Sequence, residues 1–267
     1  MQRVMQLIFS AAAMLAGQAA AQVQPPKELA NPGKITYGVA ATFAPFEYMQ
    51  DGKLAGFDIE MLDAMAGKMG LGVEVMNMEF KGLIPALQSK RIDIINSAMY
   101  IRPEREEQVD FVPYLTVGNE ILVRAGNPKA IAGRADMCGA RIAVTLGGFQ
   151  EKLAREDDVN CRQAGKAAVE VMTFPTAQDA ALALKNGRAD AIYNSTPGAY
   201  KQVQELPNDY AIAGKTFGPF ATIGIAVRKG DVDTRAAIGS ALAAVRADGV
   251  IDKLLSKYGM PASAKLD

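Results

Sequence analysis

From Lys34 onward, short runs rich in β-branched and aromatic residues alternate with amphipathic runs. KITYGV (34–39) has the pattern of a strand, and GFDIEMLDAMAGKMG (56–70) places Ile59, Leu62 and Met69 on one face of a helix. Further strand-like runs are VEVMNM (73–78), RIDIIN (91–96), EILVR (120–124), RIAVT (141–145), VEVMTF (169–174), ADAIYN (189–194) and TIGIAVRKG (222–230). Because helical patterns separate most of them, the alternation predicts an α/β protein whose parallel sheets are covered by helices.

One stretch of the chain is echoed 97 residues later. LQSKRIDIINSA (87–98) and LKNGRADAIYNS (184–195) share Leu, Arg, Asp and Ile at matching places. The echo indicates two similar βα lobes. Ligands of open α/β sheets bind beyond the carboxyl ends of the strands, so Ser97 and Ala98 of one lobe would face Asn194 and Ser195 of the other. We therefore expect a ligand cleft between the lobes.

The first 22 residues, MQRVMQLIFSAAAMLAGQAAAQ, combine an early cation, an apolar run and small residues. This is the pattern of a secretory signal cleaved before Gln22. A membrane anchor is the weaker interpretation, because the apolar core is shorter than the roughly 20 residues that cross a bilayer. We expect residues 1–21 to be a signal peptide and the mature chain to be soluble in the periplasm.

Composition excludes several classes of function. The sequence contains no histidine, so zinc sites and Ser-His or Cys-His catalysis lack their usual ligand and base. Without Arg3 the chain has a net charge of about −1, which gives no indication of a nucleic-acid or anionic-membrane partner. The two cysteines, Cys138 and Cys161, predict a disulfide in an exported chain, with two separately buried thiols as the alternative. No metal and no cofactor is expected.

Several segments, taken in order, carry a family resemblance. They are GVAATFAPFEY (38–48), LAGFDIEMLDAMA (54–66), GLIPALQSKRIDIINSAMYIRPEREEQVDF (82–111), ALALKNGRADAI (181–192), GIAVRKG (224–230) and VRADGVIDKLLSKYG (245–259). Together they resemble the family-3 periplasmic solute-binding proteins of ABC importers. The resemblance implies a type II periplasmic binding-protein fold, with a discontinuous first lobe (30–118 and 218–267) and a second lobe (119–217). It also implies a monomer that closes on its ligand and docks on an ABC permease in the inner membrane.

The resemblance assigns ligand contacts to three residues that match the family pattern. Arg105 falls on the arginine that holds the ligand carboxylate, a role that suits a guanidinium fork because it matches two carboxylate oxygens and stays charged. Phe43 and Phe80 fall where aromatic rings lie against the ligand side chain. Each of the three has a plainer alternative: a solvated helix arginine for Arg105, and ordinary core positions for the two rings. Glu47 is expected to be structural.

Other positions depart from the family pattern. Tyr100 replaces a Thr or Ser hydroxyl, either hydrogen-bonding the ligand or narrowing the pocket, and Ala98 offers only its backbone. In the second lobe Gly148 and Phe149 replace hydroxyl residues, although the N–H groups that begin a helix there can still receive an anion. Ser195 stands where the family has the aspartate that pairs with an α-ammonium. The ligand is therefore expected to be a small carboxylate, either an amino acid whose ammonium is held by other groups or a compound with a masked or absent amine.

Three functions remain open from the sequence. The first is the substrate-binding component of an ABC importer for an amino acid or related small carboxylate, without enzymatic activity. The second is an enzyme on the same fold, similar to cyclohexadienyl dehydratases, with Glu47 as a general acid. The third is a soluble sensor that reports its ligand to a membrane receptor. The sensor differs from the importer component only in its protein partner.

Overall fold

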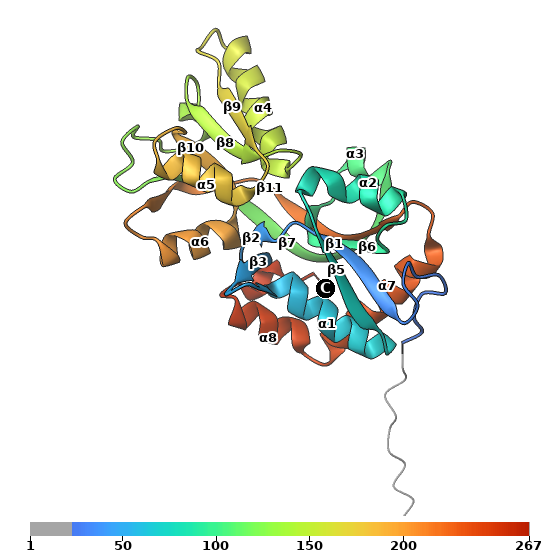
Figure 1. The fold of residues 1–267 in the computed structure, drawn as a ribbon. Helices are drawn as coiled ribbons and strands as arrows, with labels where there is room; N and C mark the ends of the chain where they lie inside the picture. The colour runs from blue at the N-terminus through green and yellow to red at the C-terminus, as the bar shows by residue number, and fades with distance from the viewer. Residues whose placement is uncertain (1–22, 267) are drawn as a thin grey trace, which may run out of the picture.

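The computed structural model describes residues 23–266, and the expected signal peptide (1–21) lies outside them. Figure 1 shows two masses joined by long strands. One sheet of eight strands runs through both, in the order β5, β1, β6, β11, β7, β10, β8, β9. Its strands are β1 Lys34–Val39, β5 Gly72–Asn77, β6 Ile94–Tyr100, β7 Val109–Arg124, β8 Arg141–Thr145, β9 Glu170–Phe174, β10 Ala191–Ser195 and β11 Tyr210–Arg228. The α/β prediction is confirmed.

The first mass is built on the parallel strands β5, β1 and β6. Its helices are α1 Phe57–Met69, α2 Leu83–Gln88, α7 Val232–Ala247 and α8 Val250–Lys257. Helix α1 lies within one residue of its predicted bounds and buries the predicted stripe against the sheet, and it ends at Gly70, whose φ of 68° is a conformation that glycine adopts easily. A small antiparallel sheet, which the sequence patterns did not predict, precedes α1; its strands are β2 Thr42–Phe43, β3 Glu47–Gln50 and β4 Lys53–Ala55.

The second mass is built on the parallel strands β10, β8 and β9. Its helices are α4 Phe149–Gln163, α5 Ala177–Lys185 and α6 Thr196–Glu205. Thr176 and Ser195 cap α5 and α6, because each hydroxyl accepts a hydrogen bond from a backbone N–H of the first turn. The predicted disulfide between Cys138 and Cys161 is present and joins the segment before β8 to the last turn of α4.

Strands β7 and β11 connect the two masses and pair with each other in antiparallel fashion. The sequence pattern predicted a strand over 120–124, whereas β7 begins at Val109 and continues through Pro113, which pairs with Gly224 next to an irregularity in the ladder. Such a position tolerates proline, which has no N–H to donate. The register also shifts between Ala213 and Phe217 and again between Phe217 and Ala221.

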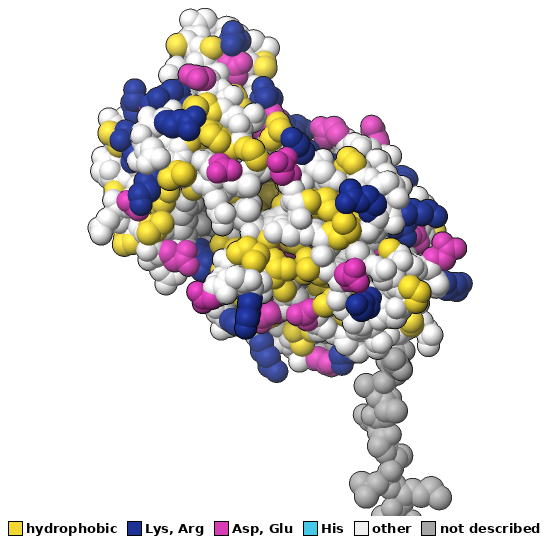
Figure 2. All heavy atoms as spheres, viewed as in Figure 1, with side chains coloured by type: hydrophobic (Ala, Val, Ile, Leu, Met, Phe, Trp, Pro, Cys, Tyr) yellow, Lys and Arg dark blue, Asp and Glu magenta, His cyan; other side chains and the backbone are white. Residues whose placement is uncertain are grey.

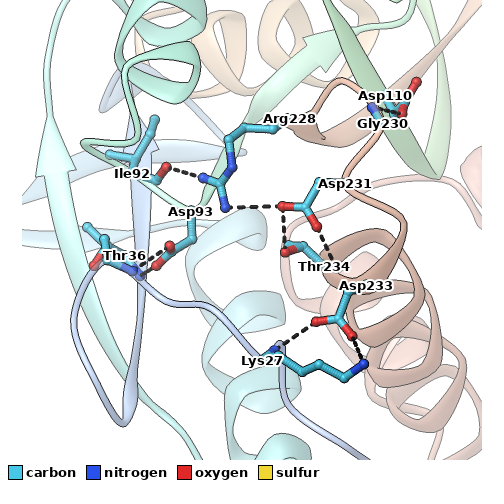
Figure 3. A network of polar contacts seen from close by, with 11 residues as sticks. Lys27, Thr36, Ile92, Asp93, Asp110, Arg228, Gly230, Asp231, Asp233 and Thr234 are labelled. Carbon is cyan, nitrogen blue, oxygen red and sulfur yellow. Dashed lines mark hydrogen bonds and ion pairs between the residues drawn. The ribbon is translucent and has the colours of Figure 1, made fainter.

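The end of the chain returns to the first mass, as Figure 3 shows. Arg228 at the end of β11 donates to the carbonyl of Ile92 and to Asp231, which in turn caps α7. Near the beginning of the described chain, Lys27 donates its backbone N–H to Asp233 on α7. The lobe boundaries at 118/119 and 217/218 remain a prediction.

The remaining elements are short: α3 Pro103–Glu106 and three 3-10 turns, η1 Phe80–Gly82, η2 Arg134–Asp136 and η3 Ala262–Ala264. No helix in the described part of the chain is long and apolar enough to cross a membrane.

Candidate functional site

A small cavity lies between the two masses, where Figure 2 shows the surface hollowed and hydrophobic side chains gathered. Its volume is about 40 Å³, which holds water molecules but is far below the several hundred Å³ of a typical ligand pocket. Six of the eight predicted ligand-binding residues line it: Phe43, Phe80, Ala98, Tyr100, Gly148 and Phe149. The other lining residues are Ala40, Thr42, Glu47, Thr145, Gln150 and Ala177.

Arg105 lies beside this cavity, on the short helix α3, and bridges the two masses. Its Nη1 donates to the carbonyl of Tyr100 and its Nη2 to the carbonyl of Gly147, both at 2.8 Å. The guanidinium also lies over the ring of Phe80, with 5.2 Å from its central carbon to the ring centroid. Burial, and then the neighbouring Arg102, lower the pKa of Arg105 to about 9, so the side chain is still charged at pH 7.

A second bridge joins β6 to the beginning of α4. The rings of Tyr100 and Phe149 stack with centroids 4.7 Å apart and planes at 12°. Gln150 donates to the hydroxyl of Tyr100 at 3.2 Å and to the side-chain carbonyl of Asn119 at 3.0 Å. Both aromatic side chains are buried in this arrangement. Tyr100 lines the cavity, and contacts between predicted site residues join the two masses. Both roles predicted for Tyr100 remain predictions.

A buried pair of acids, Glu47 on β3 and Asp58 on α1, lies at the inner side of the cavity. Glu47 accepts a hydrogen bond from the hydroxyl of Ser97, and Asp58 accepts from the backbone N–H of Ala98 and from the hydroxyl of Tyr114. Burial raises the pKa of Asp58 to about 7 and raises that of Glu47 well above its ordinary value, with the charge of Asp58 as the next cause.

The N–H groups at the beginning of α4 are partly occupied in this closed arrangement. Gly147 donates its N–H to the carboxylate of Glu151 at 2.7 Å, and Gly148 donates to the carbonyl of Thr145 at 3.0 Å. An anion at this helix end would therefore meet the N–H groups of the helical residues that follow, Phe149 and Gln150, rather than those of the glycines.

Ser195, like Arg105, is a predicted ligand-binding residue that does not line the cavity. Its hydroxyl caps α6 by accepting from Gly198 N–H at 3.2 Å, and its side chain is fully buried. Asn194 lines an adjoining open groove of about 640 Å³ between the β2–β4 sheet and helices α5 and α6; the groove shares Thr42, Phe43 and Ala177 with the cavity. Sequence reasoning missed Gln150 and gave Glu47 no ligand contact. Gln150 could have been found, because it follows Phe149 in the first turn of a predicted helix.

The family model of bacterial extracellular solute-binding proteins, family 3, matches residues 35–261. The chain belongs to this family. TcyJ, an L-cystine-binding protein of Escherichia coli, is 30% identical over 228 residues, which cover 85% of this chain and 82% of that protein. An L-arginine-binding protein of Pseudomonas aeruginosa is 32% identical over 240 residues, which cover 84% of this chain and 87% of that protein.

Solved structures agree with this membership. An ancestral arginine-binding protein bound to arginine has a TM-score of 0.78 at 38% identity and covers 85% of this chain and 98% of its own. An ancestral amino-acid-binding protein described as a precursor of cyclohexadienyl dehydratase has a TM-score of 0.76 at 32% identity, with 85% and 95% covered. The expected family and the two-lobed fold are confirmed.

Proposed function

We propose that this protein is the periplasmic substrate-binding component of an ABC importer, and that it captures an amino acid or a related small carboxylate without transforming it. The observation that carries the proposal is the buried, charged guanidinium of Arg105 at the junction of the two masses. A charged group in such a place needs acceptors, and it now uses two backbone carbonyls. A ligand carboxylate is a stronger acceptor and matches the guanidinium fork. Relatives that bind cystine and arginine support the class of ligand.

The small cavity implies a binding cycle. A ligand of amino-acid size does not fit into about 40 Å³, so it enters only when the two masses have moved apart. It would then contact residues of both and shift the equilibrium back toward the closed form, which a permease in the inner membrane would recognise. We expect a monomer to perform this cycle, because both walls of the cavity come from one chain.

The test is a thermal-shift screen followed by calorimetry on Arg105→Ala. A ligand present at 100 times its dissociation constant adds about 2.7 kcal/mol of stability, which raises the melting temperature of a chain of this size by roughly 5 to 11 °C. Truncating a buried charge that pairs with the ligand costs about 2 kcal/mol or more, so Arg105→Ala should weaken carboxylate binding at least about 30-fold. Arg91→Ala, at an exposed arginine, is the matched control. Equal affinity in both variants would refute the site.

A dehydratase on the same fold is the second candidate. It is favoured by one observation: a buried carboxyl, Glu47, with a raised pKa lines the cavity and could donate a proton. Incubation with prephenate or arogenate, followed by ultraviolet detection of an aromatic product, separates the two functions. Product formed by the wild type and not by Glu47→Gln would establish the enzyme and overturn the transport proposal.

The sensor hypothesis concerns the partner rather than the site. Co-purification with a permease that is encoded beside this chain would support import, whereas ligand-dependent binding to a receptor ectodomain would support sensing. The cavity would bind the ligand in the same way in both cases.

A further inference from the structure

The carboxyl of Glu47 is buried without a balancing positive charge. Glu47 and Asp58 are 1% and 0% exposed, and in the described chain the groups acting on them are each other, Ser97, Tyr114 and the Ala98 N–H, with no cation among them. Two carboxylates this close cannot both stay ionised in a buried place. Burial raises the pKa of both carboxyls, and it holds the pKa of Glu47 well above its ordinary value, so Glu47 carries a proton in this site.

Glu47 is also placed to meet a ligand. Among the cavity-lining residues it is the one carboxylic acid in the part of the chain that the structure describes. Its Oε1 accepts from Ser97, but its Oε2 receives no N–H or O–H from residues 23–266. In the second mass, Ser195 does not line the cavity; its hydroxyl caps α6, and it supplies no charge. A positively charged group in this cavity would therefore find its counter-charge in Glu47.

The other groups that face Glu47 and Asp58 are neutral near pH 7 or lie outside the buried site. Tyr37 on β1 and Tyr114 on β7 face the two acids, and burial together with the acids' charges raises the pKa of both phenols, which stay neutral. Ser97 on β6 is neutral. Asp63 on α1 is exposed, and its charge helps to raise the pKa of Tyr37. The proton shared by Glu47 and Asp58 is thus the one that can leave this cluster near neutral pH.

We infer that Glu47 takes the place of the aspartate absent at Ser195 and accepts the α-ammonium of the ligand, releasing its own proton to solvent as the ligand binds. The inference rests on the proposed capture of an amino acid. The O–H bond of Glu47 breaks, the proton passes to water or buffer, and an N–H of the ammonium replaces it as hydrogen-bond donor. One positive charge enters as one leaves, so the buried site gains no net charge from the ammonium.

The wild-type experiment is calorimetry at pH 6 in buffers of different ionisation enthalpy. The probes are the standard L-amino acids and L-cystine, and then, for each binder, the same carboxylate without its amine. We expect about one proton to be released per amino acid bound, and none when the carboxylate without an amine binds. Affinity for the amino acid should rise up to about tenfold per pH unit over the pH range in which Glu47 of the free protein is protonated.

The outcomes separate this inference from the proposed function. Amino-acid binding without proton release, or binding of amine-free carboxylates alone, overturns the role of Glu47 and leaves carboxylate capture standing. Failure of every probe to bind refutes carboxylate capture, and the role of Glu47 with it.

The variant experiment uses Glu47→Gln, whose amide can still donate to Asp58 and accept from Ser97. It should abolish proton release and weaken binding of the amino acid by about 30-fold or more, while the amine-free carboxylate binds as before. Asp63→Asn, the same change at an exposed acid of α1, should alter neither. Equal weakening of both ligands by Glu47→Gln would mean a structural role and would overturn the inference.

Discussion

The disulfide between Cys138 and Cys161 gives a stability prediction whose size follows from the chain. The two cysteines are 23 residues apart, so the bond closes a short loop that contains β8 and most of α4. In the chain-entropy model, closing a loop of this length removes about 3 kcal/mol of freedom from the unfolded state. Replacing both residues by alanine should therefore lower the free energy of unfolding by about 3 kcal/mol and the melting temperature by roughly 6 to 12 °C.

Urea unfolding of the oxidised wild type, the reduced wild type and the double-alanine variant measures this effect. The reduced protein and the variant should agree within about 1 kcal/mol, the ordinary effect of a small side-chain change. Binding should hardly change, because Cys161 lies three turns from Phe149, about 18 Å along the helix. A loss below 1 kcal/mol in both samples would refute the loop argument.

Three further predictions concern Gly56, the Glu47–Asp58 pair and the hydrogen bond between Gln150 and Tyr100. Gly56→Ala should cost more than about 3 kcal/mol, because φ is 132° and the new Cβ would lie 2.1 Å from the carbonyl oxygen of Phe46; Gly67→Ala, in open space on α1, should gain up to about 1 kcal/mol in the same urea assay. Stability should fall by up to about 4 kcal/mol as pH rises from 4 to 8, because burial raises the pKa of both acids of the pair, that of Asp58 from 3.8 to about 7, and the folded chain keeps protons that the unfolded chain has released. Asp58→Asn should reduce the pH dependence of the free energy of unfolding. If the dependence is unchanged, it arises from groups other than the acid pair. Tyr100→Phe should cost about 1 kcal/mol by removing the acceptor of Gln150, and no loss in urea unfolding would contradict that hydrogen bond.

The internal echo, residues 87–98 and 184–195, was visible in the sequence, and the structure gives a reason for its repeated aspartate. Asp93 and Asp190 each accept a hydrogen bond from the backbone N–H of a neighbouring strand, Thr36 in one mass and Arg141 in the other. Each also donates its own N–H to the carbonyl of that same residue. The repeated aspartate therefore locks two strands together in each mass. The strands and helices were also predictable, because the buried face of each element leaves a regular spacing of apolar residues in the sequence.

The contacts across the cleft were not predictable from sequence patterns. Tyr100 and Phe149 stack although 49 positions separate them, and Arg105 reaches a backbone carbonyl at Gly147, which no side-chain pattern records. The partnership of Glu47 with Asp58 depends on the unpredicted small sheet that carries Glu47. Patterns report which face of an element is buried, but not which elements meet.

The irregular ladder between β7 and β11 has a consequence for measuring motion. Between Ala213 and Ala221 only Phe217 retains a register partner on β7, and Gly214 and Gly218, with φ of 74° and 81°, occupy the two gaps. Backbone amides in these gaps should exchange with deuterium sooner than those in the regular ladder on either side. A fluorescent label placed there would follow opening and closing from outside the cavity, and so without competing with the ligand.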